Sequence, residues 1–586
     1  RSYSSKGEDV VTRNWMALAA TLEQLVAVPL EPIPENPHKR PPIVSDAAPD
    51  FVKTVTAAML AGLGDALPVS AFPPDGTWPT GTTQWEKRNI AEEVPIWKPD
   101  LCTQCNHCVA ACPHSAIRAK VVQPQEMENA PSALQSLDVK SRDMRGQKYV
   151  LQVAPEDCTG CNLCVEVCPA KDRQDPSIKA INMADRIDHL EEERANYDFF
   201  LKLPEIDKTT LERIDIRTSQ LITPLFEYSG ACSGCGETPY IKLITQLYGD
   251  RLLIANATGC SSIYGGNLPS TPYTTNAEGR GPAWANSLFE DNAEFGLGFR
   301  LTVDQHRRRV LRLVASLEEH IPAELLGGLR DDTVTPEVKR EHVTALRKIL
   351  ADIDTPDARQ LATDADHLVD KSIWLIGGDG WAYDIGFGGL DHVLSLTEKV
   401  NVLVLDTQCY SNTGGQQSKA TPLGAVTKFA EQGKRKSRKD LGVSMMMYGH
   451  VYVAQISLGA QLNQTVKAIQ EAEAYPGPSL IIAYSPCEEH GYDLALSHDQ
   501  MKQLTTTGFW PLYRFDPRRA DEGKPALALD SRPPGAGLTD TLNNEQRFRR
   551  LNAQQPEVAT ALYAAAEKEL KQKYEFLAML AGKSAD

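Results

Sequence analysis

Short apolar runs separated by stretches with a helical pattern dominate the chain from about residue 206 onward. Such runs, alternating with helices, are typical of buried strands in a mostly parallel sheet. The pattern predicts an α/β domain over 206–515, with a charged helical excursion over 303–370. The predicted strands are 252–256, 373–376, 400–405, 451–454 and 480–484.

The rest of the chain divides into four predicted parts. Residues 1–47 are predicted to contain a helix followed by a proline-rich linker, and 48–89 a short linking domain. A cysteine-rich α+β domain is predicted over 90–205. Residues 516–586 are predicted to form a C-terminal helical extension.

Two cysteine runs with the same spacing indicate the chemistry of the 90–205 domain. Residues 102–112 and 158–168 both follow the pattern C-x2-C-x2-C-x3-C, and Pro113 or Pro169 comes next. This pattern holds [4Fe–4S] clusters, so its doubling predicts a ferredoxin-like domain with two clusters, which moves single electrons. Zinc is the alternative, but it is usually bound by cysteine pairs separated by a longer gap.

In modules of this kind the fourth cysteine of each run binds the cluster of the other run. The first predicted ligand set is Cys102, Cys105, Cys108 and Cys168. The second predicted set is Cys158, Cys161, Cys164 and Cys112. This crossing would also hold the two halves of the module together.

Four further cysteines predict a metal site in the α/β domain. Cys232 and Cys235 form a C-x2-C loop, and Cys260 and Cys487 each follow a predicted strand. Ligand-binding residues in open α/β sheets gather beyond the carboxyl ends of strands, so the four thiols can meet there. A zinc site with four cysteine ligands also fits this spacing. The neighbouring electron-transfer module favours a third [4Fe–4S] cluster.

A phosphate and magnesium site is predicted at two other strand ends. Gly378, Asp379 and Gly380 form a turn whose backbone can approach a phosphate while the aspartate faces a divalent ion. Thr407 and Asn412, after the next strand, offer the oxygen ligands that magnesium prefers. The pairing of this turn with Asn412 resembles the thiamine-diphosphate motif; two unrelated turns are the alternative.

Charge and composition narrow the class of protein. The 586 residues carry a net charge of −16, which argues against a protein that binds nucleic-acid phosphates. No apolar run is long enough to span a membrane, and 13 cysteines fit a reducing compartment, so we expect a cytoplasmic protein. The chain begins with Arg1, as a fragment or a processed piece would.

A local basic stretch lies between the two cysteine runs. Its four cations are Lys140, Arg142, Arg145 and Lys148. They can attract an acidic electron carrier, or they can belong to a solvated loop.

Longer motifs resemble one family, the pyruvate:ferredoxin (or flavodoxin) oxidoreductases. Besides the two cysteine runs, the matching stretches are 77–89, 226–240, 257–266, 292–298, 410–415 and 485–491. The resemblance implies oxidative decarboxylation of pyruvate with coenzyme A to acetyl-CoA and CO2. Electrons would pass from thiamine diphosphate through three [4Fe–4S] clusters to ferredoxin or flavodoxin. The alternatives are an enzyme for another 2-oxoacid and a pure electron-transfer subunit that binds no thiamine.

The resemblance also assigns residues. It implies that the cluster nearest the thiamine is bound by Cys232, Cys235, Cys260 and Cys487. It implies Asp379, Thr407 and Asn412 as magnesium ligands, joined by the backbone carbonyl of Cys409, with Asn412 also near the reacting carbons.

Single-chain members of that family are about twice this long, and the chain resembles their C-terminal half. The N-terminal half, or a separate subunit, would supply the glutamate that activates thiamine and most contacts to the substrate. The resemblance further implies that residues 1–47 are the end of an interior α/β domain and its linker, and that the whole enzyme is a homodimer.

Overall fold

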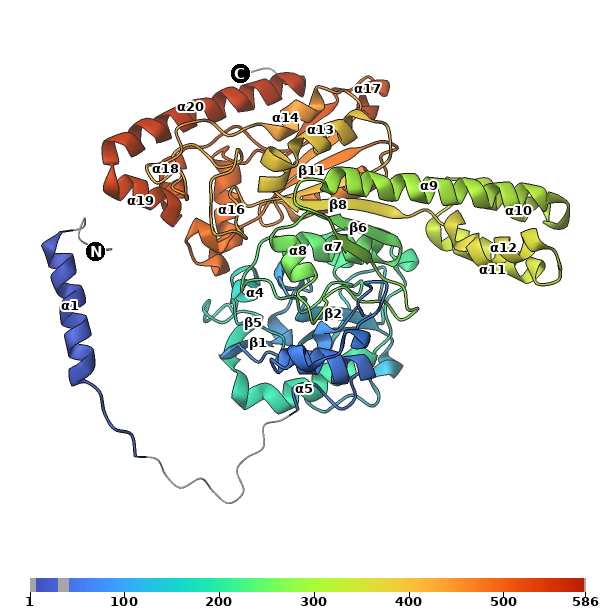
Figure 1. The fold of residues 1–586 in the computed structure, drawn as a ribbon, viewed down its shortest axis with the longest axis horizontal. Helices are drawn as coiled ribbons and strands as arrows, with labels where there is room; N and C mark the ends of the chain where they lie inside the picture. The colour runs from blue at the N-terminus through green and yellow to red at the C-terminus, as the bar shows by residue number, and fades with distance from the viewer. Residues whose placement is uncertain (1–6, 30–41, 584–586) are drawn as a thin grey trace.

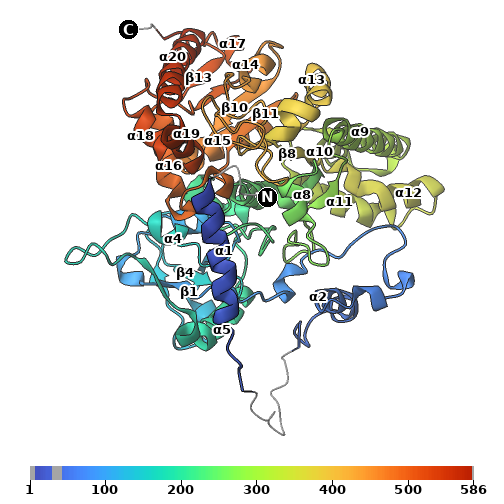
Figure 2. The same cartoon turned by 60° about the vertical axis from the view of Figure 1, so that its left-hand side comes forward.

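The computed structural model describes residues 7–29 and 42–583, which form two stacked modules and a projecting helical arm (Figures 1 and 2). Helix α1 (Glu8–Glu23) has no buried residue and lies apart from both modules in Figure 1. Residues 30–41 of the predicted proline-rich linker lie outside the described residues.

Two small antiparallel sheets frame the cysteine-rich module. Strand β1 pairs with β5, and β4 lies between β2 and β3. The strands are β1 (Glu93–Trp97), β2 (Ile117–Val122), β3 (Leu137–Asp138), β4 (Lys148–Val153) and β5 (Ile181–Asp185). The helices are α3 (His107–Ala111), α4 (Leu163–Glu166) and α5 (Arg186–Lys202), of which α5 packs against β4. Val150 and Phe200 are fully buried between them.

An eight-stranded sheet forms the second module, in the order β13-β12-β10-β11-β9-β8-β6-β7. The six strands from β10 to β7 are parallel, and β12 and β13 add an antiparallel edge. The parallel strands are β6 (Leu252–Asn256), β7 (Ala283–Asn286), β8 (Ser372–Gly378), β9 (Asn401–Asp406), β10 (Tyr452–Ile456) and β11 (Ser479–Tyr484). The predicted mostly parallel α/β fold is therefore confirmed.

Burial on both faces explains why the central strands could be recognised from the sequence. Every residue of β9 and β11 is buried, which matches their continuous apolar runs. Strand β7 is half-exposed and its four residues lack such a run, so no strand was predicted there.

Four neighbouring strands, β6, β8, β9 and β11, bring their carboxyl ends to one edge of the sheet. In the pairing register Ile376 lies beside Asn256, and Gly378 beside Leu405. Tyr484, the last residue of β11, lies beside Asp406. Cys260, Asp379, Thr407 and Cys487 follow these strand ends, so the topology alone gathers these four.

Helices cover the sheet and form the arm. Those of the sheet module are α7 (Thr238–Tyr248), α8 (Cys260–Gly265), α13 (Phe387–Ser395), α14 (Leu441–Met446), α15 (Leu462–Glu473) and α16 (Ser497–Thr506). The arm comprises α9 (Asn292–Ser316), α10 (Ala323–Arg330), α11 (Pro336–Leu350) and α12 (Pro356–Asp364). It has its own core, with Leu329 and Leu346 fully buried, and it confirms the helical excursion predicted from the charged stretch.

The last part of the chain contains more than helices. Strands β12 (Tyr513–Phe515) and β13 (Leu527–Leu529) extend the sheet before α17 to α20 complete the module. The helices there are α17 (Arg518–Asp521), α18 (Leu538–Asn543), α19 (Gln546–Gln554) and α20 (Pro556–Leu580). Because Phe548 and Leu577 belong to the core of the sheet module, this segment packs as part of that module.

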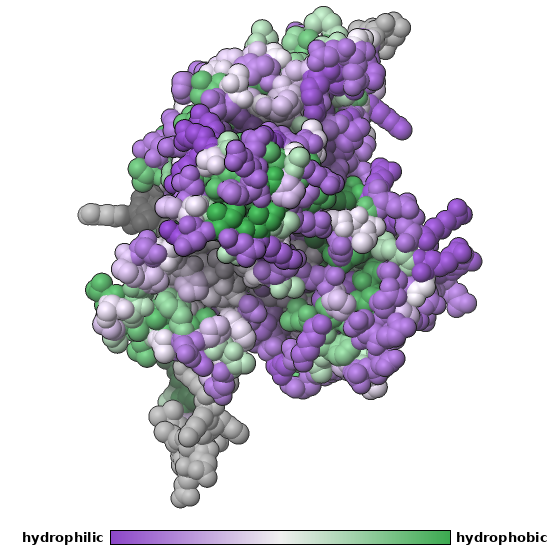
Figure 3. Space-filling model, turned by 90° about the vertical axis from the view of Figure 1, so that its right-hand side faces the viewer, coloured by the Kyte–Doolittle hydropathy of each residue, from purple (hydrophilic) through white to green (hydrophobic). Residues whose placement is uncertain are grey.

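The surface seen from the side of the arm is mainly hydrophilic, with smaller hydrophobic areas between (Figure 3). No helix within the two described ranges is both long and apolar enough to cross a membrane.

Candidate functional site

Two cavities in the cysteine-rich module are each lined by four thiols. The first is lined by Cys102, Cys105, Cys108 and Cys168. The second is lined by Cys112, Cys158, Cys161 and Cys164. The structure thus brings together the same two crossed sets that the spacing predicts.

The two loops wrap their cavities with the same local geometry. Gln104 and Gly160, each two residues after the first cysteine of a run, have left-handed backbones with φ of 58° and 67°. This conformation points the backbone N–H of Gln104 at the Cys102 sulfur (3.3 Å) and that of Gly160 at the Cys158 sulfur (3.4 Å). Backbone donors to sulfur are the contacts that stabilise and tune iron–sulfur clusters.

The thiols are arranged around a volume and do not converge on a point. Among the described residues, no group of three or more His, Cys, Asp or Glu side chains is placed to hold a single metal ion. Burial raises the pKa of Cys158 to about 12 and that of Cys161 to about 11, so a bound metal group would displace their protons. These cavities fit a multi-atom cluster better than one zinc ion.

The third cysteine set lies at the sheet edge. Cys260 begins α8 directly after β6, and Cys487 follows β11. The loop that carries Cys235 docks there, because the Gly236 N–H donates to the Pro486 carbonyl at 3.0 Å. A Cβ on Gly236 would lie 2.3 Å from the Pro486 ring, so only glycine permits this approach.

The thiols of this third set affect one another. Burial first, and then the neighbouring charges of Glu237 and the other three thiols, raise the pKa of Cys260. Glu237 is itself buried and accepts a hydrogen bond from the Tyr264 hydroxyl at 2.9 Å. Its burial raises the pKa of Glu237 to about 7.

The third set touches the second cavity. The Ser233 hydroxyl, from the loop between Cys232 and Cys235, donates to the Thr159 carbonyl next to Cys158 at 3.2 Å. The two cysteine loops are therefore in direct contact, which is the arrangement that electron transfer between them requires.

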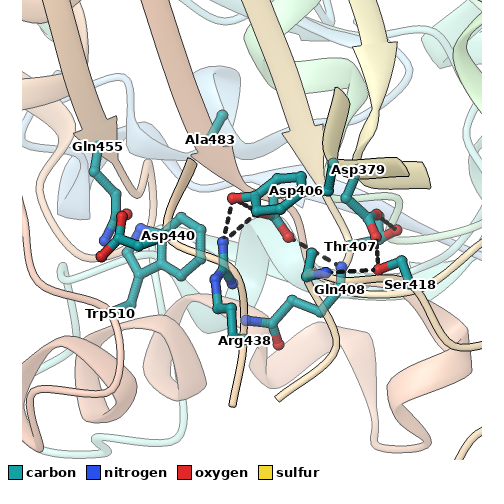
Figure 4. Close-up of polar contacts among 12 residues, drawn as sticks. Asp379, Asp406, Thr407, Gln408, Ser418, Arg438, Asp440, Gln455, Ala483 and Trp510 are labelled. Atoms are coloured by element: carbon teal, nitrogen blue, oxygen red, sulfur yellow. Dashed lines mark hydrogen bonds and ion pairs between the residues drawn. The ribbon is translucent and has the colours of Figure 1, made fainter. Parts of the chain in front are cut away.

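The predicted magnesium ligands Asp379 and Thr407 lie together at the ends of β8 and β9 (Figure 4). The Thr407 hydroxyl lies 3.0 Å from Asp379 Oδ1 and 3.1 Å from the Cys409 carbonyl oxygen. The Ser418 hydroxyl donates to the other Asp379 oxygen at 2.5 Å. This cluster of carboxylate, hydroxyl and carbonyl oxygens has the donor chemistry of a magnesium site.

A second buried carboxylate lies beside it. Asp406 accepts from the Tyr383 hydroxyl (2.8 Å) and from the Arg438 guanidinium (2.5 Å). Burial, followed by the Asp406 charge, raises the pKa of Asp379. A bound cation would relieve both effects, so the cluster fits a divalent ion.

The glycines of the turn leave room for a ligand and a neighbour. A Cβ on Gly380 would lie 2.5 Å from the Tyr410 ring, so glycine is required for this packing. A Cβ on Gly378 would meet only the Leu405 carbonyl oxygen, at 3.9 Å, so this position leaves open space. This space is compatible with the prediction that a phosphate approaches the backbone at Gly378.

Asn412 is not part of this cluster. Its side chain is exposed, and within the described ranges it makes no hydrogen bond to the other predicted ligands. The hydroxyls of Ser411 and Ser418 contact Thr407 and Asp379 instead. No sequence signal singled out these two serines, because nothing in their spacing distinguishes them from other loop serines.

Models of known families match three parts of the chain. A 4Fe–4S dicluster domain matches residues 101–171, and the C-terminal TPP binding domain of thiamine pyrophosphate enzymes matches 360–483. A domain of unknown function, EKR, matches 37–91.

Curated relatives match almost the whole chain. The chain is 80% identical to a probable pyruvate-flavodoxin oxidoreductase of Escherichia coli over all its residues, which are 50% of that protein. It is 52% identical to the pyruvate-flavodoxin oxidoreductase of Rhodospirillum rubrum, with 99% of the chain and 49% of the relative covered. It is 45% identical to the pyruvate:ferredoxin oxidoreductase of Moorella thermoacetica, with 98% and 49% covered. The chain thus spans about half the length of the curated relatives it matches.

A solved 2-oxoglutarate:ferredoxin oxidoreductase from Magnetococcus marinus is a distant neighbour, with 15% identity and a TM-score of 0.28. The aligned region covers 48% of this chain and 70% of the chain of that structure. This likeness is too remote to bear on the fold.

Proposed function

We propose that the chain is the electron-transfer and diphosphate-binding half of a pyruvate-flavodoxin oxidoreductase, because it is 80% and 52% identical to two such proteins and spans about half their length. The whole enzyme would convert pyruvate and coenzyme A to acetyl-CoA and CO2, and would pass the electrons to a flavodoxin or ferredoxin. The observation that carries the proposal is the hydrogen bond from Ser233, in the Cys232–Cys235 loop, to the Thr159 carbonyl in the second cysteine run. It joins the sheet edge that bears Asp379 to the two-cavity module.

Each predicted ligand has a role in this proposal. The two crossed cysteine sets hold one [4Fe–4S] cluster each, and Cys232, Cys235, Cys260 and Cys487 hold a third. Asp379, Thr407 and the Cys409 carbonyl hold magnesium, and the open backbone at Gly378 receives the diphosphate. Bound thiamine diphosphate supplies the means to stabilise the carbanion left by decarboxylation. Asn412 stays a predicted ligand and a predicted neighbour of the reacting carbons.

The protein's own contribution is placement and electrostatics. Arg438 neutralises Asp406, so one net negative charge, that of Asp379, is left for the cation. His490 links the ends of β11 and β9, because its Nε2 lies 2.8 Å from the Thr407 carbonyl oxygen. This contact fixes the Cys487 loop relative to the magnesium ligands. The other half of the enzyme would add the glutamate that activates thiamine and most contacts to pyruvate.

Electrons would leave through the first cavity, where the basic stretch lies. The Gln104 side chain donates to the Asp138 carbonyl at 2.8 Å and accepts from the Lys140 N–H at 2.8 Å. Lys140 Nζ also donates to the Cys102 carbonyl at 2.7 Å. These contacts fix the stretch on the rim of the cavity, with Arg142 and Arg145 exposed. An acidic one-electron carrier would be attracted to this position.

A cofactor assay on anaerobically purified full-length enzyme tests the proposal. We expect one thiamine diphosphate per chain and about twelve irons, as three four-iron clusters require. Iron without thiamine would instead support a pure electron-transfer subunit, and zinc in the third set would refute the electron path. Bleaching of the visible absorbance by pyruvate with coenzyme A, but not by 2-oxoglutarate, would identify the substrate.

A further inference from the structure

Lys242 is a buried cation at the junction between the two modules. It lies on α7, and only 2% of its surface is exposed. Its Nζ donates hydrogen bonds to the backbone carbonyls of Val109, Ala110 (3.0 Å) and Cys112 (3.2 Å). Among the described residues it has no carboxylate partner within ion-pair distance.

The number of acceptors indicates the charged form. A neutral amine has two N–H groups, whereas an ammonium has three and no acceptor. Three carbonyl oxygens around Nζ therefore match the ammonium ion. A buried positive charge is costly unless negative charge lies nearby. Since no carboxylate supplies that charge, the nearest candidates are the groups held in the two cysteine-lined cavities.

Helix α3 places Lys242 next to both cavities. The helix carries Cys108, which lines the first cavity, and ends immediately before Cys112, which lines the second. The three carbonyls that Lys242 contacts belong to the residues between these two thiols and to Cys112 itself. The ammonium therefore lies where the ligands of the two cavities are joined by a single turn of helix.

We propose that the positive charge of Lys242 stabilises the reduced form of both ferredoxin-type clusters. The inference rests on the proposed function, because it needs clusters in both cavities. Reduction adds one negative charge to a cluster, and a cation in a poorly hydrated interior favours that added charge. Net charge around a cluster is one of the factors that set its reduction potential. A shared cation would also keep the two reduction potentials similar, so that electron transfer between the clusters involves only a small change in free energy.

The chain offers a matched control for the structural part of this role. Lys339 is 4% exposed and donates to three carbonyls at the end of α10, those of Gly328 (2.8 Å), Leu329 (3.1 Å) and Asp331 (2.6 Å). It lies in the helical arm, which contains none of the cluster cysteines (Figure 1). Lys339→Met therefore removes the same kind of contact without removing charge near a cluster.

The test is a redox titration monitored by EPR on the full-length enzyme that contains this chain. Wild type, Lys242→Met, Lys242→Arg and Lys339→Met would be compared at equal iron content. The two ferredoxin-type clusters are identified by the mutual broadening of their signals when both are reduced. In Lys242→Met we expect the equilibrium constant for reduction of each to fall about tenfold, a shift of 59 mV to more negative potential. Lys242→Arg and Lys339→Met should keep the wild-type potentials.

Two results would overturn the inference. One is a pair of unchanged potentials in Lys242→Met with all iron retained; the other is a shift confined to one of the two clusters. If Lys242→Met loses iron, Lys242→Gln gives the same readout, because its amide still donates to the carbonyls without a charge. Failure of the proposed function is distinguishable, since wild-type enzyme would then contain no [4Fe–4S] signals.

Discussion

The Arg438 guanidinium lies 2.5 Å from the fully buried Asp406 carboxylate and 4.7 Å above the Trp510 ring, at the edge of the sheet. This ion pair distinguishes the Asp406 carboxylate from the neighbouring carboxylate of Asp379. Asp406 is neutralised by Arg438, whereas Asp379 has only hydroxyl partners in the structure. The contrast makes Asp379 the member of the pair that is available to a cation (Figure 4).

Arg438→Met should destabilise the sheet module. It leaves Asp406 buried without its cation, and breaking a buried ion pair in this way costs about 3–5 kcal/mol. We expect the midpoint temperature of thermal unfolding to be lower than in wild type. Tryptophan fluorescence would be used to monitor the unfolding. Arg435→Met changes an exposed arginine on the same loop and should leave the midpoint unchanged. Equal midpoints for the two variants would show that the ion pair contributes nothing measurable.

Cys112→Ser should remove the cluster of the second cysteine run, although Cys112 belongs to the first run. Its thiol lines the cavity that Cys158, Cys161 and Cys164 surround, so the crossed ligand would be lost. We expect about four of the twelve irons to disappear, together with one set of EPR signals. Cys409→Ser should keep all iron, because only its backbone carbonyl points to the predicted magnesium site. Loss of the first cluster alone in Cys112→Ser would contradict the crossed assignment.

The sequence was most informative where chemistry or burial imposes a pattern. The two crossed cysteine sets could be predicted, because binding of a cluster fixes the spacing of its ligands. The strands β6, β9 and β11 could be predicted because burial on both faces requires apolar runs. The Arg438–Asp406 pair could not, because residues more than thirty positions apart meet only through the sheet topology. For the same reason the contacts of Lys434, whose Nζ donates to the Ser418 and Thr421 carbonyls, could not be predicted.

His490 should make the sheet module sensitive to acid. Burial lowers the pKa of His490 to about 4, with a further lowering by Arg547. Between pH 6.5 and 4 the unfolded chain binds this proton and the folded chain does not, so stability falls as the pH drops through this window. The maximum loss is about 3 kcal/mol, at about 1.36 kcal/mol per pH unit. His490→Gln, which keeps a donor for the Thr407 carbonyl, should flatten the unfolding midpoint between pH 7.5 and 5.5.

The control for that experiment is His392→Gln on the exposed surface of α13, which should retain the wild-type dependence on pH. If His490→Gln and wild type lost stability equally on acidification, another group would have to be responsible.

Reversing the charge of Arg142 and Arg145 should weaken the productive encounter with an acidic carrier. Both are exposed, whereas Lys140 and Lys148 already contact the Cys102 carbonyl and Asp138. We expect the double change to glutamate to raise KM for flavodoxin several-fold at low salt, with kcat unchanged, and the difference to shrink as salt is added. Arg308 and Arg312, exposed on the arm, provide an equal change of charge far from the cavity. The same KM in both double variants would place the docking surface elsewhere.

The magnesium site makes different demands on Asp379 and Asn412. Asp379→Asn removes the buried carboxylate that is left available to a cation, so it should abolish retention of magnesium and thiamine diphosphate after gel filtration of the full-length enzyme. Removing that carboxylate also removes the repulsion from Asp406, so the apoprotein should unfold no earlier than wild type. Asp391→Asn, on α13, is the matched control, because its carboxylate contacts only the Tyr448 hydroxyl at 2.9 Å.

Asn412→Ala then decides whether the exposed asparagine is a ligand. If its amide oxygen binds the ion once the loop closes over the cofactor, retention of both magnesium and thiamine diphosphate should fall, though less than in Asp379→Asn, because a neutral donor is lost in place of a charged one. Ser418→Ala separates this effect from the loss of a hydroxyl that holds Asp379 in place. Suppose that Asn412→Ala retains magnesium and thiamine diphosphate fully while Ser418→Ala loses them. Asn412 would then not be a ligand, and the ion would be bound by the oxygen cluster around Asp379.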